Sequence, residues 1–103
     1  MGKRMAFRVL ESDFDAYWVK VKKRGTWWPA TREGATMNTV GNRVFVIGGA
    51  NRIITNDVFS YRYYADRWEC IKPAGEKLPP IFGHTAVTFK DNIVIFGGET
   101  NYN

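Results

Sequence analysis

The chain contains one histidine and one cysteine, two residue types that often carry nucleophilic or acid–base chemistry. A catalytic base needs a partner nucleophile or acid that the fold places beside it, so His84 gains such a role only through its neighbours. A structural zinc site takes about four Cys or His ligands, and this chain is too poor in both. Cys70 can form no intrachain disulfide, and we predict that it is a buried structural thiol.

Two other patterns could suggest a reaction site. Asp13 and Asp15 could form a pair of carboxylates, but we favour a solvated turn. Gly48 and Gly49 follow an apolar run and open no helix, so they do not form a phosphate-binding loop. We therefore expect no catalytic residue, no metal and no cofactor.

A basic run beside aromatic residues is a candidate binding surface. Residues 20–24 read Lys-Val-Lys-Lys-Arg, and Trp27 and Trp28 follow closely. Phosphates could bind the cations while bases stack on the rings. The alternative is a strand end with solvated lysines and packed tryptophans. We favour the alternative because four charges are few for a nucleic-acid site and no nucleic-acid-binding motif accompanies them. Nucleic acid is therefore not an expected partner.

The net charge of +5 lies entirely in the first third of the 103 residues. Residues 1–32 hold eight cationic and three anionic side chains, whereas residues 33–103 hold seven of each sign. Hydrophobic residues make up 45% and aromatic residues 16% of the chain, which favours a folded domain over disorder. No apolar run approaches the roughly 18 residues of a membrane span, and we find no secretory signal. We expect an intracellular, cytoplasmic protein without membrane contact.

Two segments repeat each other at a distance of 49 residues. Residues 44–49 read Val-Phe-Val-Ile-Gly-Gly, and residues 93–98 read Ile-Val-Ile-Phe-Gly-Gly. The same shift places Gly34 on Gly83 and Thr36 on Thr85. Each copy therefore reads as a glycine, a short strand, a polar turn, a second strand and a glycine pair.

Strands explain this pattern better than helices, because the runs are short, rich in β-branched residues and bounded by Gly, Asn or Pro. The second strand of each unit is apolar on both faces, so its sheet needs cover on both sides. Four-stranded sheets stacked around an axis supply that cover in a β-propeller. A polar loop follows Gly49. The predicted strands of one antiparallel unit span 35–40, 43–48, 56–62 and 67–72, and those of a preceding unit span 6–11 and 16–22.

These residues resemble the kelch repeat. Its marks are a glycine pair that closes the second strand, a tyrosine and a tryptophan separated by six residues, and Gly-His-Thr at the start of the first strand. The resemblance implies scaffold roles, with the two rings packed between blades and a structural histidine. The first copy departs from it at Ala35. The matching residues are Gly34, Gly48, Gly49, Tyr61, Trp68, Gly83, His84, Gly97 and Gly98.

The resemblance covers 16–103 and implies an all-β kelch-type β-propeller, with about two blades' worth in this chain. We expect 1–32 to supply the third and fourth strands of a split blade, 33–73 a complete blade, and 74–103 the first two strands of the next. A propeller closes with about four to eight blades. The others would come from further copies, with a six-bladed trimer favoured, from another polypeptide, or from a longer kelch chain.

The predicted function is a non-enzymatic protein-interaction or scaffold module in a larger assembly, because no catalytic set accompanies the repeat. Propellers also host enzymes. The alternatives are therefore a kelch-fold enzyme with its active site in blade loops near the propeller axis, and a basic subunit of a nucleoprotein complex. Exposed aromatic and basic residues are typical interface anchors, although such rings can also fill gaps between blades. The candidate interaction surface comprises Lys20, Lys22, Lys23, Arg24, Trp27, Trp28, Tyr63 and Tyr64.

Overall fold

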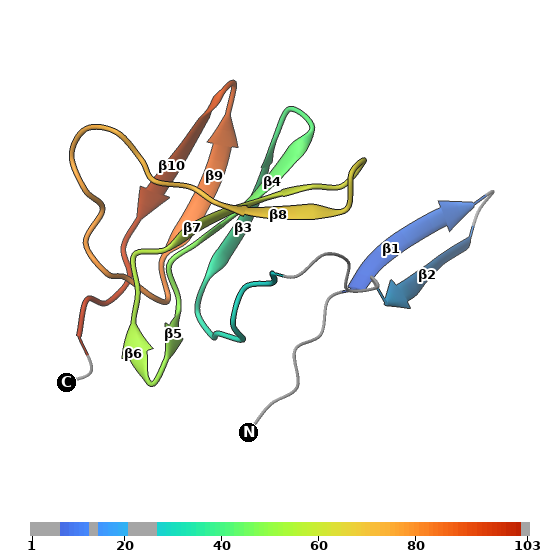
Figure 1. Cartoon of the computed structure of the whole chain (residues 1–103). Helices are drawn as coiled ribbons and strands as arrows, with labels where there is room; N and C mark the ends of the chain where they lie inside the picture. The colour runs from blue at the N-terminus through green and yellow to red at the C-terminus, as the bar shows by residue number, and fades with distance from the viewer. Residues whose placement is uncertain (1–6, 13–14, 21–26, 102–103) are drawn as a thin grey trace.

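The computed structural model describes residues 7–12, 15–20 and 27–101, and these residues form short antiparallel sheets (Figure 1). The first is a hairpin of β1 (Phe7–Ser12) and β2 (Asp15–Lys20), with Phe7 opposite Lys20. These two strands fall within one or two residues of the predicted ones. Asp15 opens β2, and Asp13 lies outside the described residues.

The centre of the structure is a four-stranded antiparallel sheet in the order β3-β4-β7-β8. Each strand pairs with the next one along the sheet, so the predicted up-and-down unit is confirmed. β4 lies between two neighbours and contributes two buried residues, Val46 and Ile47. The bounds are β3 (Thr36–Val40), β4 (Arg43–Ile47), β7 (Val58–Arg62) and β8 (Arg67–Cys70).

A small hairpin occupies the segment that was expected to be a polar loop. It joins β5 (Ala50–Asn51) to β6 (Ile53–Ile54) through Arg52, whose φ is +70°. Each strand of this hairpin is two residues long, and Ile53 is 70% exposed. The sequence therefore lacks the alternation of apolar and polar residues that would predict a hairpin. Sequence reasoning therefore missed it.

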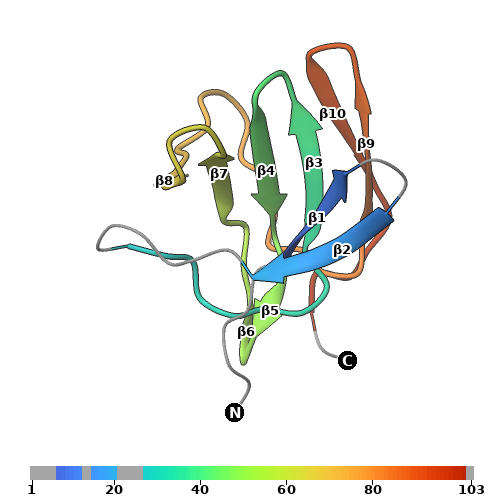
Figure 2. The ribbon, with the colours of Figure 1, turned by 90° about the vertical axis from the view of Figure 1, so that its right-hand side faces the viewer.

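The second repeat forms a two-stranded sheet of β9 (Thr85–Phe89) and β10 (Asn92–Phe96). Figure 2 shows this hairpin beside β3, with β4, β7 and β8 following in order. Isolated bridges pair Glu33 with Ala50 and Phe82 with Glu99. Because 82 and 99 are each 49 residues beyond 33 and 50, the sequence repeat is also a repeat of backbone pairing.

The core lies where the sheet meets the segment that leads into β9. Ser60, in the middle of β7, has no solvent-exposed surface. Among the described residues, no helix has the length and apolar character needed to span a membrane. The buried hydrophobic residues are Val46, Ile47, Ala50, Phe59 and Ile81.

Candidate interaction surface

The two tryptophans that precede the complete blade pack on one of its faces. The ring centroid of Trp27 lies 5.2 Å from that of Phe59, and the ring centroid of Trp28 lies 6.2 Å from that of Trp68. Trp27 remains 42% exposed, whereas Trp28 is half-buried. The pair therefore contributes mainly to covering the blade, in line with the gap-filling alternative.

Arg32 fastens the same connecting segment to the blade, and its side chain is only 10% exposed. The guanidinium donates to the Gly48 carbonyl at 3.1 Å, to Thr55 Oγ1 at 3.3 Å and to Asp57 Oδ2 at 3.1 Å. It also lies 4.7 Å from the ring centroid of Phe59. Sequence reasoning missed this residue, because a single arginine in a loop gives no signal of its partners.

His84 sits at the junction between the two repeats. It is 5% exposed, and its Nε2 lies 2.9 Å from Thr36 Oγ1 at the start of β3. Its Nδ1 is also buried. A Cβ added at Gly48 would lie 2.9 Å from His84 Cε1, so the ring packs directly on the glycine pair. The histidine joins one repeat to the next, as a packing residue would.

Burial lowers the pKa of His84 below its usual 6.5, and the backbone of Ile47 partly opposes that effect. The unfolded chain then binds more protons than the folded chain between the lowered pKa and 6.5. The stability contributed by neutral His84 is therefore present above pH 6.5 and is lost as the pH falls through the folded pKa. We expect the melting temperature to fall between pH 7 and pH 5, and His84→Gln to flatten that dependence. An unchanged slope in His84→Gln would contradict this assignment.

Tyr61 and Trp68 pack against each other across β7 and β8, with their ring planes tilted by 40°. They are directly paired in the sheet, and their ring centroids are 4.9 Å apart. The Tyr61 hydroxyl donates to Asp66 Oδ1 at 2.5 Å, within the turn that joins the two strands. This bond ties the ring pair to the turn.

Tyr63 and Tyr64 form the exposed part of the predicted surface. They are 50% and 73% exposed, and their ring centroids are 4.9 Å apart. Large exposed rings held as a pair have little conformational freedom left to lose on binding, which suits an interface anchor. Lys20 is exposed at the end of β2. The remaining predicted residues, Lys22, Lys23 and Arg24, lie outside the described residues.

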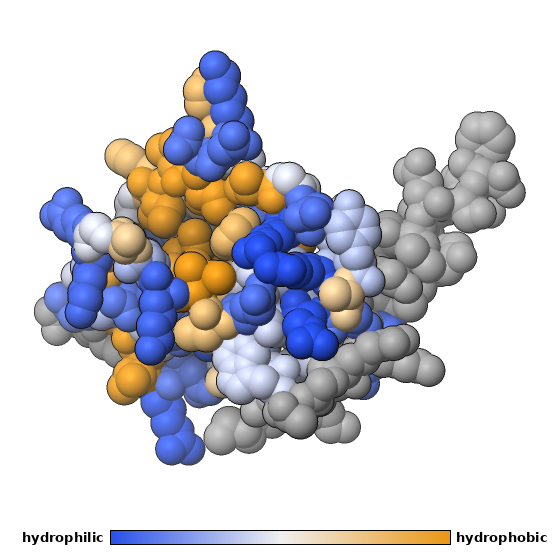
Figure 3. Space-filling view, turned by 45° about the horizontal axis from the view of Figure 1, so that its top comes forward, coloured by the Kyte–Doolittle hydropathy of each residue, from blue (hydrophilic) through white to orange (hydrophobic). Residues whose placement is uncertain are grey.

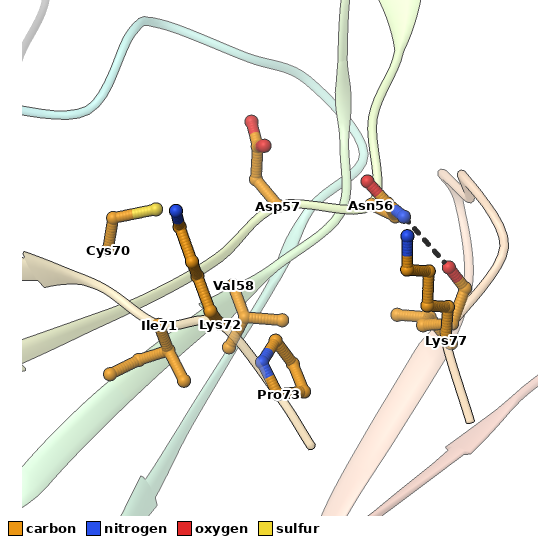
Figure 4. A pocket seen from close by; sticks show the side chains of 9 residues that line it. Asn56, Asp57, Val58, Cys70, Ile71, Lys72, Pro73 and Lys77 are labelled. Carbon is orange, nitrogen blue, oxygen red and sulfur yellow. Dashed lines mark hydrogen bonds between the residues drawn. The ribbon is translucent and has the colours of Figure 1, made fainter. Parts of the chain in front are cut away.

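A cavity of about 330 Å³ lies between the start of β7 and the end of β8 (Figure 4). Asn56 Nδ2 donates to the Leu78 carbonyl at 3.0 Å across one wall. Asp57 in the same cavity is already paired with Arg32. Among the described residues, no three His, Cys, Asp or Glu side chains gather to hold a metal ion. The lining residues are Asn56, Asp57, Val58, Cys70, Ile71, Lys72, Pro73, Lys77 and Leu78.

Cys70 is exposed, so the prediction of a buried thiol is wrong. It is the last residue of β8, and β8 is the edge strand of the four-stranded sheet. A residue at the end of an edge strand has a neighbour on one side only, which leaves the thiol open to solvent.

The model of the KLHDC2/KLHL20/DRC7 Kelch-repeats domain matches residues 8–98, nearly the whole chain. This chain belongs to the kelch-repeat family. The residues that carried the resemblance form the matching features of the structure. The glycine pairs have positive φ, Tyr61 packs on Trp68, and the strands of the complete blade form a four-stranded sheet. Kelch repeats typically serve as protein-interaction modules.

The kelch relatives are much longer proteins. Kelch repeat-containing protein 2 of Saccharomyces cerevisiae is 35% identical over 61% of this chain, and Tip elongation aberrant protein 1 of Schizosaccharomyces pombe is 29% identical over 84%. A tRNA wybutosine-synthesizing protein 2/3/4 of Arabidopsis thaliana is 36% identical over 71%. The chain spans about 8% of the length of each. Kelch repeats thus occur in proteins named as enzymes as well as in others.

Proposed function

We propose that this chain is a non-enzymatic protein-interaction module whose blades work inside a larger kelch propeller. The observation that carries the proposal is a sheet face of the second repeat that is open, although its counterpart in the first repeat is covered. The Tyr63–Tyr64 turn then serves as a contact for a protein partner.

The covered counterpart lies on β3. Thr36, Asn38 and Val40 share one half-buried face of this strand, and Asn38 Nδ2 donates to the Ala86 carbonyl of β9 at 3.0 Å. The His84–Thr36 contact closes the same junction. The first strand of one repeat is therefore covered by the first strand of the next.

The shift of 49 residues carries that face onto Thr85, Val87 and Phe89 of β9, which are all exposed. Val94 and Phe96 of β10 continue it, since Val94 pairs with Val87 and Phe96 with Thr85. We call these five residues the open face. Its four large side chains are 56–79% exposed. Figure 3 shows a hydrophobic area on the side of the molecule where Figure 1 places β9 and β10.

An open apolar face of this kind favours association. Burying apolar surface contributes about 25 cal/mol per Å², so covering four such side chains supplies a sizeable driving force. We infer that another kelch strand would cover the open face, because β9 covers the equivalent face of β3 in the first repeat. Further copies of this chain, in a six-bladed trimer, are one source of that strand, and another polypeptide or a longer kelch chain are the others.

Light scattering of the purified 103-residue chain tests the proposal. A single copy has a mass of 11.8 kDa. We expect a trimer mass if copies close the ring, and irregular aggregation if the other blades must come from elsewhere. The double substitution Val94→Glu with Phe96→Glu should weaken the association, whereas Tyr64→Glu, at an exposed turn, should leave it unchanged. A stable, folded single copy of the unmodified chain would contradict the proposal.

A further inference from the structure

Three arginines lie in one row across the complete blade. Arg43 opens β4, Arg62 closes β7 and Arg67 opens β8. Arg43 is directly opposite Arg62, and Arg62 is directly opposite Arg67, so all three side chains leave the same face of the sheet. Adjacent strands are about 4.8 Å apart, which places the backbones of the three arginines within about 10 Å.

The row carries more positive charge than the protein neutralises. Glu69 Oε1 lies 3.1 Å from Arg62 Nε and 3.9 Å from Arg43 Nη1. Arg67 is exposed and has no ion-pair partner among the described residues. Like charges directly opposite each other on neighbouring strands destabilise a sheet. Arg43 and Arg62 share Glu69, whereas Arg67 adds a like charge opposite Arg62. A binding role therefore explains Arg67 better than a role in the fold.

An aromatic pair adjoins the row. Tyr63 and Tyr64 follow Arg62 directly in the turn that leads to Arg67, and both rings are at least half exposed. We call the three arginines and these two tyrosines the basic rim. Its arginines stand at the ends of their strands, and propeller blades stack through their faces. Arg62 and Arg67 are exposed although β9 already covers the β3 part of the same sheet face.

We propose that the basic rim binds an acidic segment of a protein partner, an inference that rests on the proposed interaction function. Two closely spaced carboxylates would pair with Arg62 and Arg67, because the planar guanidinium donates two parallel hydrogen bonds to a carboxylate. The apolar part of the segment would lie on the tyrosine rings. With Glu69 counted, the row has an excess of two charges, which matches two carboxylates.

A nucleic acid fits this surface less well. Protein grooves for single strands follow the backbone over about 4–16 nucleotides, and binding to duplexes gains its affinity from contacts with many phosphates. The basic rim is a compact site of three cations with one carboxylate already inserted among them. It therefore suits a short acidic peptide better than a phosphate backbone.

Fluorescence anisotropy with a labelled oligoglutamate peptide tests the inference, and a labelled oligothymidylate is the competing probe. We expect Arg67→Gln to weaken oligoglutamate binding about two- to fivefold, in line with an exposed charge pair. The triple substitution of Arg43, Arg62 and Arg67 by Gln should weaken it at least about tenfold. Lys72→Gln, an exposed cation at the other end of β8, is the matched control and should change little.

Three outcomes would overturn the inference. They are equal binding by the parent and the triple variant, tighter binding of oligothymidylate than of oligoglutamate, and a lower melting temperature in Arg67→Gln. The last would show that the row supports the fold, whereas we expect an equal or higher melting temperature once a repulsive charge is removed. Light scattering of the same variants separates the two proposals, because the mass should stay that of the parent. An unmodified chain that scatters as one folded copy, and whose oligoglutamate binding the triple substitution still weakens, would refute the blade proposal alone.

Discussion

Trp68→Ala is expected to lower the free energy of unfolding by about 3–5 kcal/mol, the usual range for a tryptophan removed from a packed site. The indole contacts Tyr61 at a centroid distance of 4.9 Å and Trp28 at 6.2 Å. Its loss would therefore loosen both the pairing of β7 with β8 and the cover that the preceding segment gives to the blade. Because a whole domain is stable by only about 5–15 kcal/mol, folding should be visibly impaired. Urea denaturation at a fixed protein concentration measures the change.

Tyr64→Ala is the control for this experiment. Its ring is also aromatic and lies close in the sequence, but it is 73% exposed, so the change should stay within about 0.5 kcal/mol. Trp68→Phe should fall between the two variants, since it keeps a ring against Tyr61. If Trp68→Ala unfolds at the same urea concentration as the parent, the rings do not hold the blade together.

The strands of the blade could be predicted because the apolar runs, the turn residues and the repeat all indicated the same strands. β4 is apolar from Val44 to Ile47, Gly41 and Asn42 form the turn before it, and the glycine pair at 48–49 follows it. The repeat supports the same prediction, since residues 93–98 have the same pattern as residues 44–49. The β5–β6 hairpin has no such support: its strands are two residues long, and its turn depends on a left-handed Arg52.

The candidate site was harder to predict, because it depends on register and not on composition. Arg43, Arg62 and Arg67 are scattered in the sequence and become one row only through the pairing of β4, β7 and β8. Arg32 likewise pairs with Asp57, which lies 25 residues later in the sequence. By contrast, the exposed Tyr63–Tyr64 pair could be predicted, because adjacent aromatics in a turn between strands have no sheet neighbour to cover them.

Gly48→Ala is expected to cost more stability than Gly97→Ala, although the two glycines occupy the same place in the repeat. Their φ angles are +70° and +76°, so an alanine at either site costs about 1–2 kcal/mol for the left-handed conformation. A Cβ at Gly48 would also lie 2.5 Å from the Ile81 carbonyl oxygen, whereas a Cβ at Gly97 has no neighbour within 4 Å. That oxygen accepts a hydrogen bond from the Gly49 amide at 2.8 Å and cannot easily move.

The clash should add about 1–3 kcal/mol at Gly48, the usual penalty for overpacking. Urea denaturation of both alanine variants, at the lowest protein concentration that still gives a cooperative unfolding transition, measures the difference. Equal losses under those conditions would show that Ile81 and His84 do not hold the two repeats together at the glycine pair. If another blade covers the open face, the same contacts form around Gly97, because the repeat places it where Gly48 stands. The difference in unfolding free energy between Gly48→Ala and Gly97→Ala should then be smaller in the assembled protein. An unchanged difference would count against a kelch strand as the segment that covers the open face.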